Sequence, residues 1–247
     1  MLRLAQRRKG MDAVLAGRPV EGEGYFRTAL RGELPDAERV ELLVCLGDAL
    51  LDQGLYNEAE QQLALALALG DATGAAQGSM ADVLLLKGGD PERALWLAEQ
   101  SFALSSRECA DGEAMEHLGE ARLWTRKAQA LLQMLRREEA ERAVESAEAE
   151  TTEAHACDRD ADDVGVDLTE LLAIRPMRQR ESVAIASTHW QIGGVLAALG
   201  HDQRAAEHLR IAWSADRGGK YRKLAEKALD RIGAPAARGR HLTAARM

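Results

Sequence analysis

The chain has 247 residues, of which 46 % are hydrophobic and 29 % charged, as in soluble globular proteins with a sizeable core. Its formal net charge of −8 argues against direct binding of nucleic acid or of acidic membranes. Only five prolines and scarce β-branched runs favour helices over sheets.

The bulk sequence also indicates the compartment. No stretch approaches the run of about 18 apolar residues that a membrane helix needs, and the N-terminus lacks the apolar core of a signal peptide. The three cysteines are widely spaced and suggest neither a disulfide framework nor a metal pair. We therefore predict a soluble, cytoplasmic protein with no membrane contact.

Small and large apolar residues recur with a period of about 34 positions, which predicts a stack of helical hairpins. A degenerate copy near residues 3–36 is carried by Gly10, Ala13, Gly17, Gly22, Phe26 and Ala29. The clearest copy, residues 40–73, is carried by Leu43, Leu46, Gly47, Leu50, Gly54, Ala59, Leu63 and Ala66. Within it, the spacing of three and four residues places the leucines on one helix face. Gly47 allows a close helix contact, and Gly54 suits a helix end with positive φ.

Three further copies follow along the chain. Residues 75–108 form a weaker one, with Ala81, Leu85, Gly89, Ala94 and Ala98 in register but Gly78 and Asp82 departing from the pattern. Residues 121–150 carry Trp124, Ala128, Leu131, Ala140, Val144 and Ala147, with Leu135 in place of the turn glycine. Residues 186–219 carry Ile192, Gly193, Leu196, Gly200, Ala205, Leu209 and Ala212.

With these residues the chain resembles the tetratricopeptide repeat family. The resemblance implies an all-α, right-handed superhelical solenoid of antiparallel helical hairpins, in one domain over residues 1–232. Residues 151–180 form an acidic insertion, and residues 220–232 a helix that caps the last apolar face. The basic tail, residues 233–247, is expected to be flexible.

The acidic insertion partly resembles a calcium-binding loop, through Asp158, Asp160, Asp162 and Asp167. The match fails because Asp163 takes the place of the turn glycine and Glu170 lies one residue too late. The alternatives are a solvated acidic loop or a lid over the groove. His155 and Cys157, on an expected loop, supply only two metal ligands. We therefore predict no metal and no cofactor, and without a catalytic motif we predict no enzymatic activity.

The resemblance further implies a concave groove, lined by the first helix of each hairpin, in which a peptide or helix binds. The corresponding positions are Val44, Asp48, Leu51, Asp52, Ser79, Val83, Lys87, Arg122, Thr125, Gln129, Gln133 and Trp190. Trp190 is the best single anchor, although it could instead pack between repeats. Asp48 and Asp52 would repel a C-terminal carboxylate, which favours a basic or neutral ligand.

The main functional prediction is a non-enzymatic scaffold or adaptor that binds a protein or peptide partner. One alternative is a ligand- or peptide-sensing module in a bacterial transcriptional regulator system, because similar helical arrays serve that role. A second alternative is self-assembly, in which a repeat face pairs two chains as a homodimer.

Overall fold

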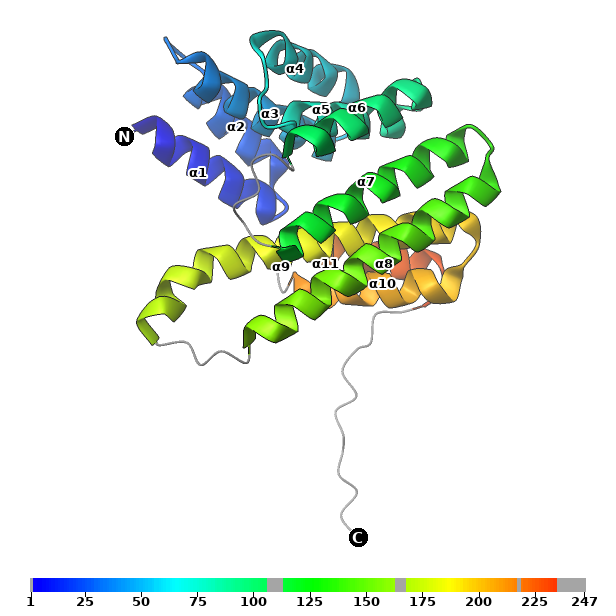
Figure 1. Cartoon of the computed structure of the whole chain (residues 1–247). Helices are drawn as coiled ribbons and strands as arrows, with labels where there is room; N and C mark the ends of the chain where they lie inside the picture. Colours follow the sequence, from blue (N-terminus) through cyan, green and yellow to red (C-terminus); the bar gives the residue numbers. More distant parts are fainter. Residues whose placement is uncertain (1, 106–112, 163–167, 217–218, 235–247) are drawn as a thin grey trace. The chain divides into compact units, whose positions relative to one another are not determined.

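The computed structural model describes the backbone of residues 2–105, 113–162, 168–216 and 219–234, and side chains over 4–104, 116–155, 182–216 and 219–234. Over these ranges the chain forms helices and no strand (Figure 1). The helices are α1 (Leu2–Leu15), α2 (Pro19–Ala29), α3 (Asp36–Asp52), α4 (Tyr56–Leu69), α5 (Ala75–Lys87), α6 (Pro91–Ser105), α7 (Glu113–Gln133), α8 (Arg137–Asp162), α9 (Leu168–Leu199), α10 (Asp202–Ala215) and α11 (Lys220–Arg231). The predicted all-α fold class is confirmed.

The helices pack as sequential antiparallel pairs, as the repeat pattern predicts. In chain order the pairs are α1–α2, α3–α4, α5–α6, α7–α8 and α9–α10, and α11 packs on α10. The copy predicted over residues 40–73 corresponds to α3 and α4, with the expected turn between Asp52 and Tyr56. The chain divides into two compact units, residues 1–172 and 173–247, and the division falls inside α9.

The first helix of each pair and the last helix, α11, end in one repeated turn geometry. At the end of α3, Gly54 N–H donates to the Leu51 carbonyl oxygen and Leu55 N–H to that of Leu50, which is the Schellman pattern. The same two bonds end α1, α5, α7, α9 and α11. In five of these six turns the residue with positive φ is glycine, namely Gly17, Gly54, Gly88, Gly200 and Gly233. Leu135, after α7, is the exception, with φ of 60°.

Small residues bring the two helices of a pair into close contact at the predicted positions. A Cβ atom on Gly47 would lie 2.7 Å from Leu63 Cγ of α4, and a Cβ on Gly193 would lie 2.8 Å from Leu209 Cγ of α10. These separations are too short for real carbon atoms, so both positions require glycine unless the facing leucine moves. Equivalent residues of two copies therefore have the same packing role.

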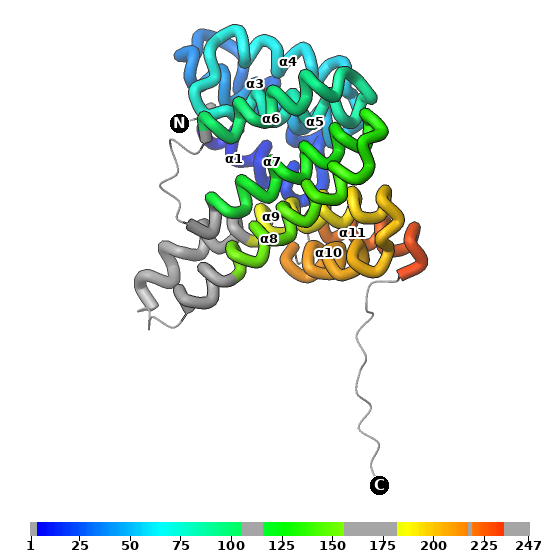
Figure 2. The backbone as a smooth tube through the Cα atoms, turned by 45° about the vertical axis from the view of Figure 1, so that its right-hand side comes forward, coloured from blue at the N-terminus to red at the C-terminus, as the bar shows by residue number. Residues whose placement is uncertain are grey.

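The apolar residues of the repeats form the core. In the first unit, one continuous cluster of buried side chains runs from Phe26 in α2 to Ala130 in α7, and it includes Leu46, Leu50 and Leu63. In the second unit, Leu209 of α10 packs with residues of α11 that are fully buried, Ala225 and Leu229. Figure 2 shows α10 and α11 lying side by side in this unit.

The prediction of a loop over the acidic insertion, residues 151–180, is wrong for most of its length. Residues 151–162 continue α8, and residues 168–180 form the first part of α9. No glycine or proline interrupts residues 151–162, and three of these residues are alanine, the strongest helix former, so nothing ends the helix locally. His155 thus lies on a helix. The calcium-type pattern includes residues 163–167, which lie outside the described residues, as does the tail from residue 235.

Candidate partner-binding face

The first helices of successive pairs in the first unit lie next to one another. Contacts join α1 to α3, α3 to α5 and α5 to α7. Among the described residues of this unit, the backbones of successive second helices lie farther apart, although the long side chain of Arg27 in α2 reaches Glu58 of α4. The first helices are therefore closer together, so the stack within this unit curves with α1, α3, α5 and α7 on its inner side. We call the side chains that these four helices present there the inner face.

Charged residues from three of these helices converge on the inner face. Arg126 of α7 donates two hydrogen bonds of 2.7 Å to the carboxylate of Asp82 in α5. The Arg126 and Asp82 side chains are only 9 % and 18 % exposed. Burial lowers the pKa of the Arg126 guanidinium, but the carboxylates of Asp82 and of Asp48 in α3 raise it more, so Arg126 stays charged.

The structure shifts the register of this copy by one residue: Gly88 is the equivalent of Gly54, so the buried Ala81 takes the place of Gly47 and Asp82 that of Asp48. Arg126, the partner of Asp82, was not among the predicted site residues. An aspartate that is partly buried between first helices needs a cation nearby, and that requirement was the signal that could have led to Arg126.

The α3 part of the inner face combines apolar and acidic groups. Val44 is buried, whereas Asp48, Leu51 and Asp52 are half-buried. Nearby, Arg7 of α1 forms an ion pair with Glu41 of α3. Asp48 and Asp52 add negative charge beyond that pair, which is the feature that would favour a basic or neutral ligand.

The predicted residues of α5 and α7 differ in accessibility. Val83 is fully buried, and Thr125 is fully buried with its hydroxyl donating to the Ala121 carbonyl oxygen. Ser79, Arg122 and Gln129 are half-buried. The two remaining residues are exposed at the helix ends: Lys87 pairs with Glu60 of α4 at 2.9 Å, and Gln133 donates to the Leu85 carbonyl oxygen.

Trp190 belongs to the second unit, whereas the other predicted residues belong to the first. Its ring is half-buried against the α10–α11 core, with its centroid 5.9 Å from that of Tyr221. This packing inside the unit agrees with the structural alternative considered for Trp190.

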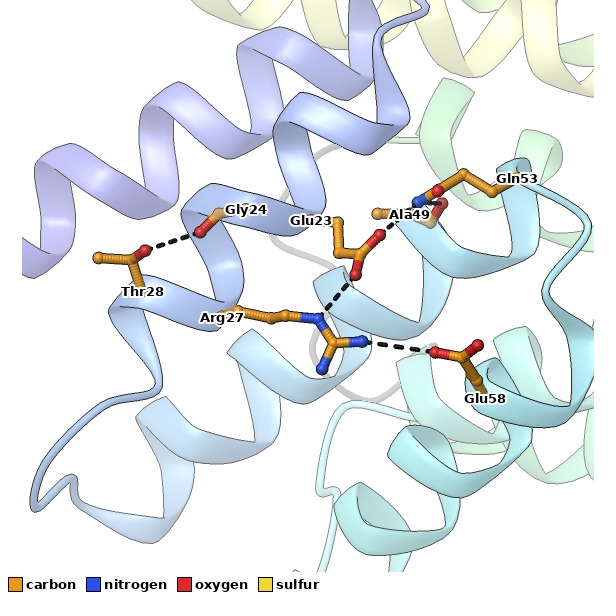
Figure 3. Close-up of polar contacts among 7 residues, drawn as sticks. All are labelled: Glu23, Gly24, Arg27, Thr28, Ala49, Gln53 and Glu58. Atoms are coloured by element: carbon orange, nitrogen blue, oxygen red, sulfur yellow. Dashed lines mark hydrogen bonds and ion pairs between the residues drawn. The ribbon is translucent and has the colours of Figure 1, made fainter.

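A polar network joins the first helix pair to the second on the side of α2 (Figure 3). Glu23 of α2 accepts hydrogen bonds from Arg27 Nε at 2.7 Å and from Gln53 Nε2 of α3 at 2.9 Å. The guanidinium of Arg27 also lies 3.5 Å from a carboxylate oxygen of Glu58 in α4. The hydrogen bonds from Gln53 and Arg27 lower the pKa of the Glu23 carboxyl, so the network fixes the charge of Glu23.

Within the described residues, no helix is both long and apolar enough to cross a membrane.

Comparisons with known proteins give the following results. No family model matches the sequence, and no curated protein matches it significantly. Among solved structures, MamA from Desulfovibrio magneticus RS-1 aligns over 87 % of this chain and 95 % of its own, with 19 % identity and a TM-score of 0.47. Nearly identical TPR-like repeats from Podosopora anserina align over 87 % and 92 %, with 15 % identity and a TM-score of 0.47. A tetratricopeptide repeat protein from Parabacteroides merdae ATCC 43184 aligns over 94 % and 98 %, with 17 % identity and a TM-score of 0.37.

The geometry of the chain itself shows the repeat fold. Its antiparallel helix pairs share one turn geometry and one pattern of small contact residues. The chain thus folds as a TPR-like stack of antiparallel helix pairs.

Proposed function

We propose that this protein is a non-enzymatic interaction module whose inner face binds a basic or neutral peptide or helix of a partner protein. The observation that carries the proposal is the unbroken succession of contacts from α1 through α3 and α5 to α7. It gives four helices one shared surface, long enough for an extended segment to contact several of them at once.

The chemistry of that surface supports the choice of ligand. The Asp82–Arg126 pair neutralises itself between α5 and α7, while Asp48 and Asp52 contribute carboxylates on α3 and Arg122 a half-buried guanidinium on α7. Gln129 offers a half-buried amide, and Leu51 a half-buried apolar group. Such a mixture suits a segment whose backbone and basic side chains donate hydrogen bonds and whose apolar side chains supply contact area.

The accessible groups and the buried ones have different parts in this proposal. Val83 and Thr125 form the floor beneath the face, because neither has exposed atoms to offer a ligand. Direct contact is assigned to Asp48, Asp52 and Gln129.

The test uses the full-length chain and a library of short peptides of varied charge, with affinity measured by fluorescence anisotropy. The binding variant Asp48→Asn/Asp52→Asn removes two charges from α3. The matched control Glu99→Gln/Glu145→Gln removes two exposed charges from the second helices α6 and α8. Circular dichroism verifies that both variants are folded.

We expect basic or neutral peptides to bind the wild type and the control equally. Loss of two partly exposed charge contacts should weaken binding to the α3 variant by about five- to tenfold. The proposal is wrong if no peptide binds, or if the best peptides bind all three proteins with the same affinity.

Trp190 needs its own experiment, because it lies in the other unit. Trp190→Ala should lower the stability of the fold through lost contact with Tyr221, and leave peptide affinity unchanged. A loss of affinity at unchanged stability would instead make Trp190 a ligand anchor.

A further inference from the structure

Three side chains of metal-binding type meet between α7 and α8, away from the residues assigned to peptide contact. His117 and Glu120 are three residues apart on α7, so they share a helix face. Glu150 faces them from the antiparallel helix α8. His117 Nδ1 lies 2.8 Å from Glu150 Oε2, and one donor atom from each of the three residues lies within 4.8 Å of the other two.

The surroundings hold these groups in place. All three side chains are half-buried, and residues close to them on the two helices are buried in the fold, including Leu118, Ala121, Ala147 and Thr151. The α7–α8 pair is closely packed along both helices. The three donors are therefore set by a helical framework and need only rotamer changes to converge on one ion.

The local charges favour a cation. The carboxylates of Glu120 and Glu150 share this half-buried site, so their negative charges lie close together. Glu116 on α7 and Glu153 on α8 add further negative charge to the same site. A divalent cation would offset this concentration of negative charge.

We propose that His117, Glu120 and Glu150 form a binding site for one divalent transition-metal ion, for which Zn²⁺ is the best match. One imidazole nitrogen and two carboxylate oxygens are a ligand set that Zn²⁺ uses, with the fourth position left to water. Ca²⁺ and Mg²⁺ prefer all-oxygen sites, so they should compete poorly. The ion would tie α7 to α8 across their interface, and this role does not depend on the peptide-binding proposal.

The experiment is calorimetric titration of Zn²⁺ into the chelator-treated full-length chain near neutral pH, with melting curves recorded in parallel. The chain has six histidines, so a variant series separates this site from other binding. The site variants are His117→Ala, Glu120→Gln and Glu150→Gln. The control His201→Ala/Glu145→Gln removes one histidine and one glutamate from elsewhere in the described chain.

We expect one stoichiometric Zn²⁺ site in the wild type and the control, and a loss of at least about tenfold in affinity in each site variant. Glu120→Gln is the sharpest test. It removes the repulsion between carboxylates, so the metal-free variant should melt at or above the wild-type temperature, yet its melting temperature should no longer rise with Zn²⁺. Equal Zn²⁺ binding by the site variants and the wild type, or no stoichiometric binding by the wild type, would overturn the proposal.

Discussion

Leu135 offers a sharp test of how the repeat turns are stabilised. It is the only residue other than glycine with positive φ among the described residues, and its side chain is 90 % exposed. Replacing it with glycine therefore removes the steric cost of left-handed backbone, about 1–2 kcal/mol, while little packing is lost. The greater entropy of glycine in the unfolded chain offsets about 0.5–1 kcal/mol of this gain.

Leu135→Gly should therefore raise the free energy of unfolding by about 0.5–1 kcal/mol. In a protein of this size, that corresponds to a rise of about 1–4 °C in melting temperature. The matched control is Leu65→Gly. Leu65 is also exposed, at 53 %, but lies in the interior of α4, where glycine should destabilise by about 1 kcal/mol.

Urea denaturation followed by circular dichroism measures both variants. The same chemical change should thus have opposite signs at the two positions. If Leu135→Gly were destabilising by as much as Leu65→Gly, the left-handed backbone at Leu135 would not be strained. Glycine would then not be the residue that best fits the six equivalent turns.

Three other changes test the polar groups. Glu23→Gln should destabilise the fold by about 1 kcal/mol at neutral pH. Because folding lowers the pKa of the Glu23 carboxyl, this loss of stability relative to wild type should persist above the unfolded-state pKa and vanish as the pH falls through the folded-state pKa. Measuring the stability of both proteins across an acid pH series checks this. Asp82→Ala should cost about 3 kcal/mol by leaving Arg126 buried without its carboxylate, and adding Arg126→Met should recover most of that loss in urea denaturation. Burial raises the pKa of the Cys45 thiol to about 11. In a variant whose only cysteine is Cys45, alkylation of the folded protein at mildly alkaline pH should therefore be about 100-fold slower than alkylation of the same protein unfolded in urea. Mass spectrometry measures both rates.

Residues whose role is set by local geometry could be predicted from the sequence. Gly47 and Gly193 contact the facing leucines as their repeat positions indicate, and Gly54 and Gly200 adopt the positive φ that their turn positions require. These roles depend only on neighbouring helices of one pair, which the period of the pattern already defines.

The interactions between pairs were harder to predict. The Asp82–Arg126 ion pair joins residues 44 positions apart on two first helices. The pair forms only if α7 is rotated suitably relative to α5. The sequence does not fix that rotation, because the interval between these two repeat copies is longer than the 34-residue period. The acidic segment was misjudged for a related reason, because charge suggested a loop while the absence of helix-breaking residues over 151–162 allowed α8 to continue.

The contacts between helices also have a consequence for how the chain acquires its structure. Over the described residues, the principal helix–helix contacts join elements no more than two places apart in chain order. Contact order is therefore low, and little loop-closure entropy opposes each step of assembly. Such a chain can add one hairpin to the next while its C-terminal part is still being synthesised, so its folding can follow the direction of translation.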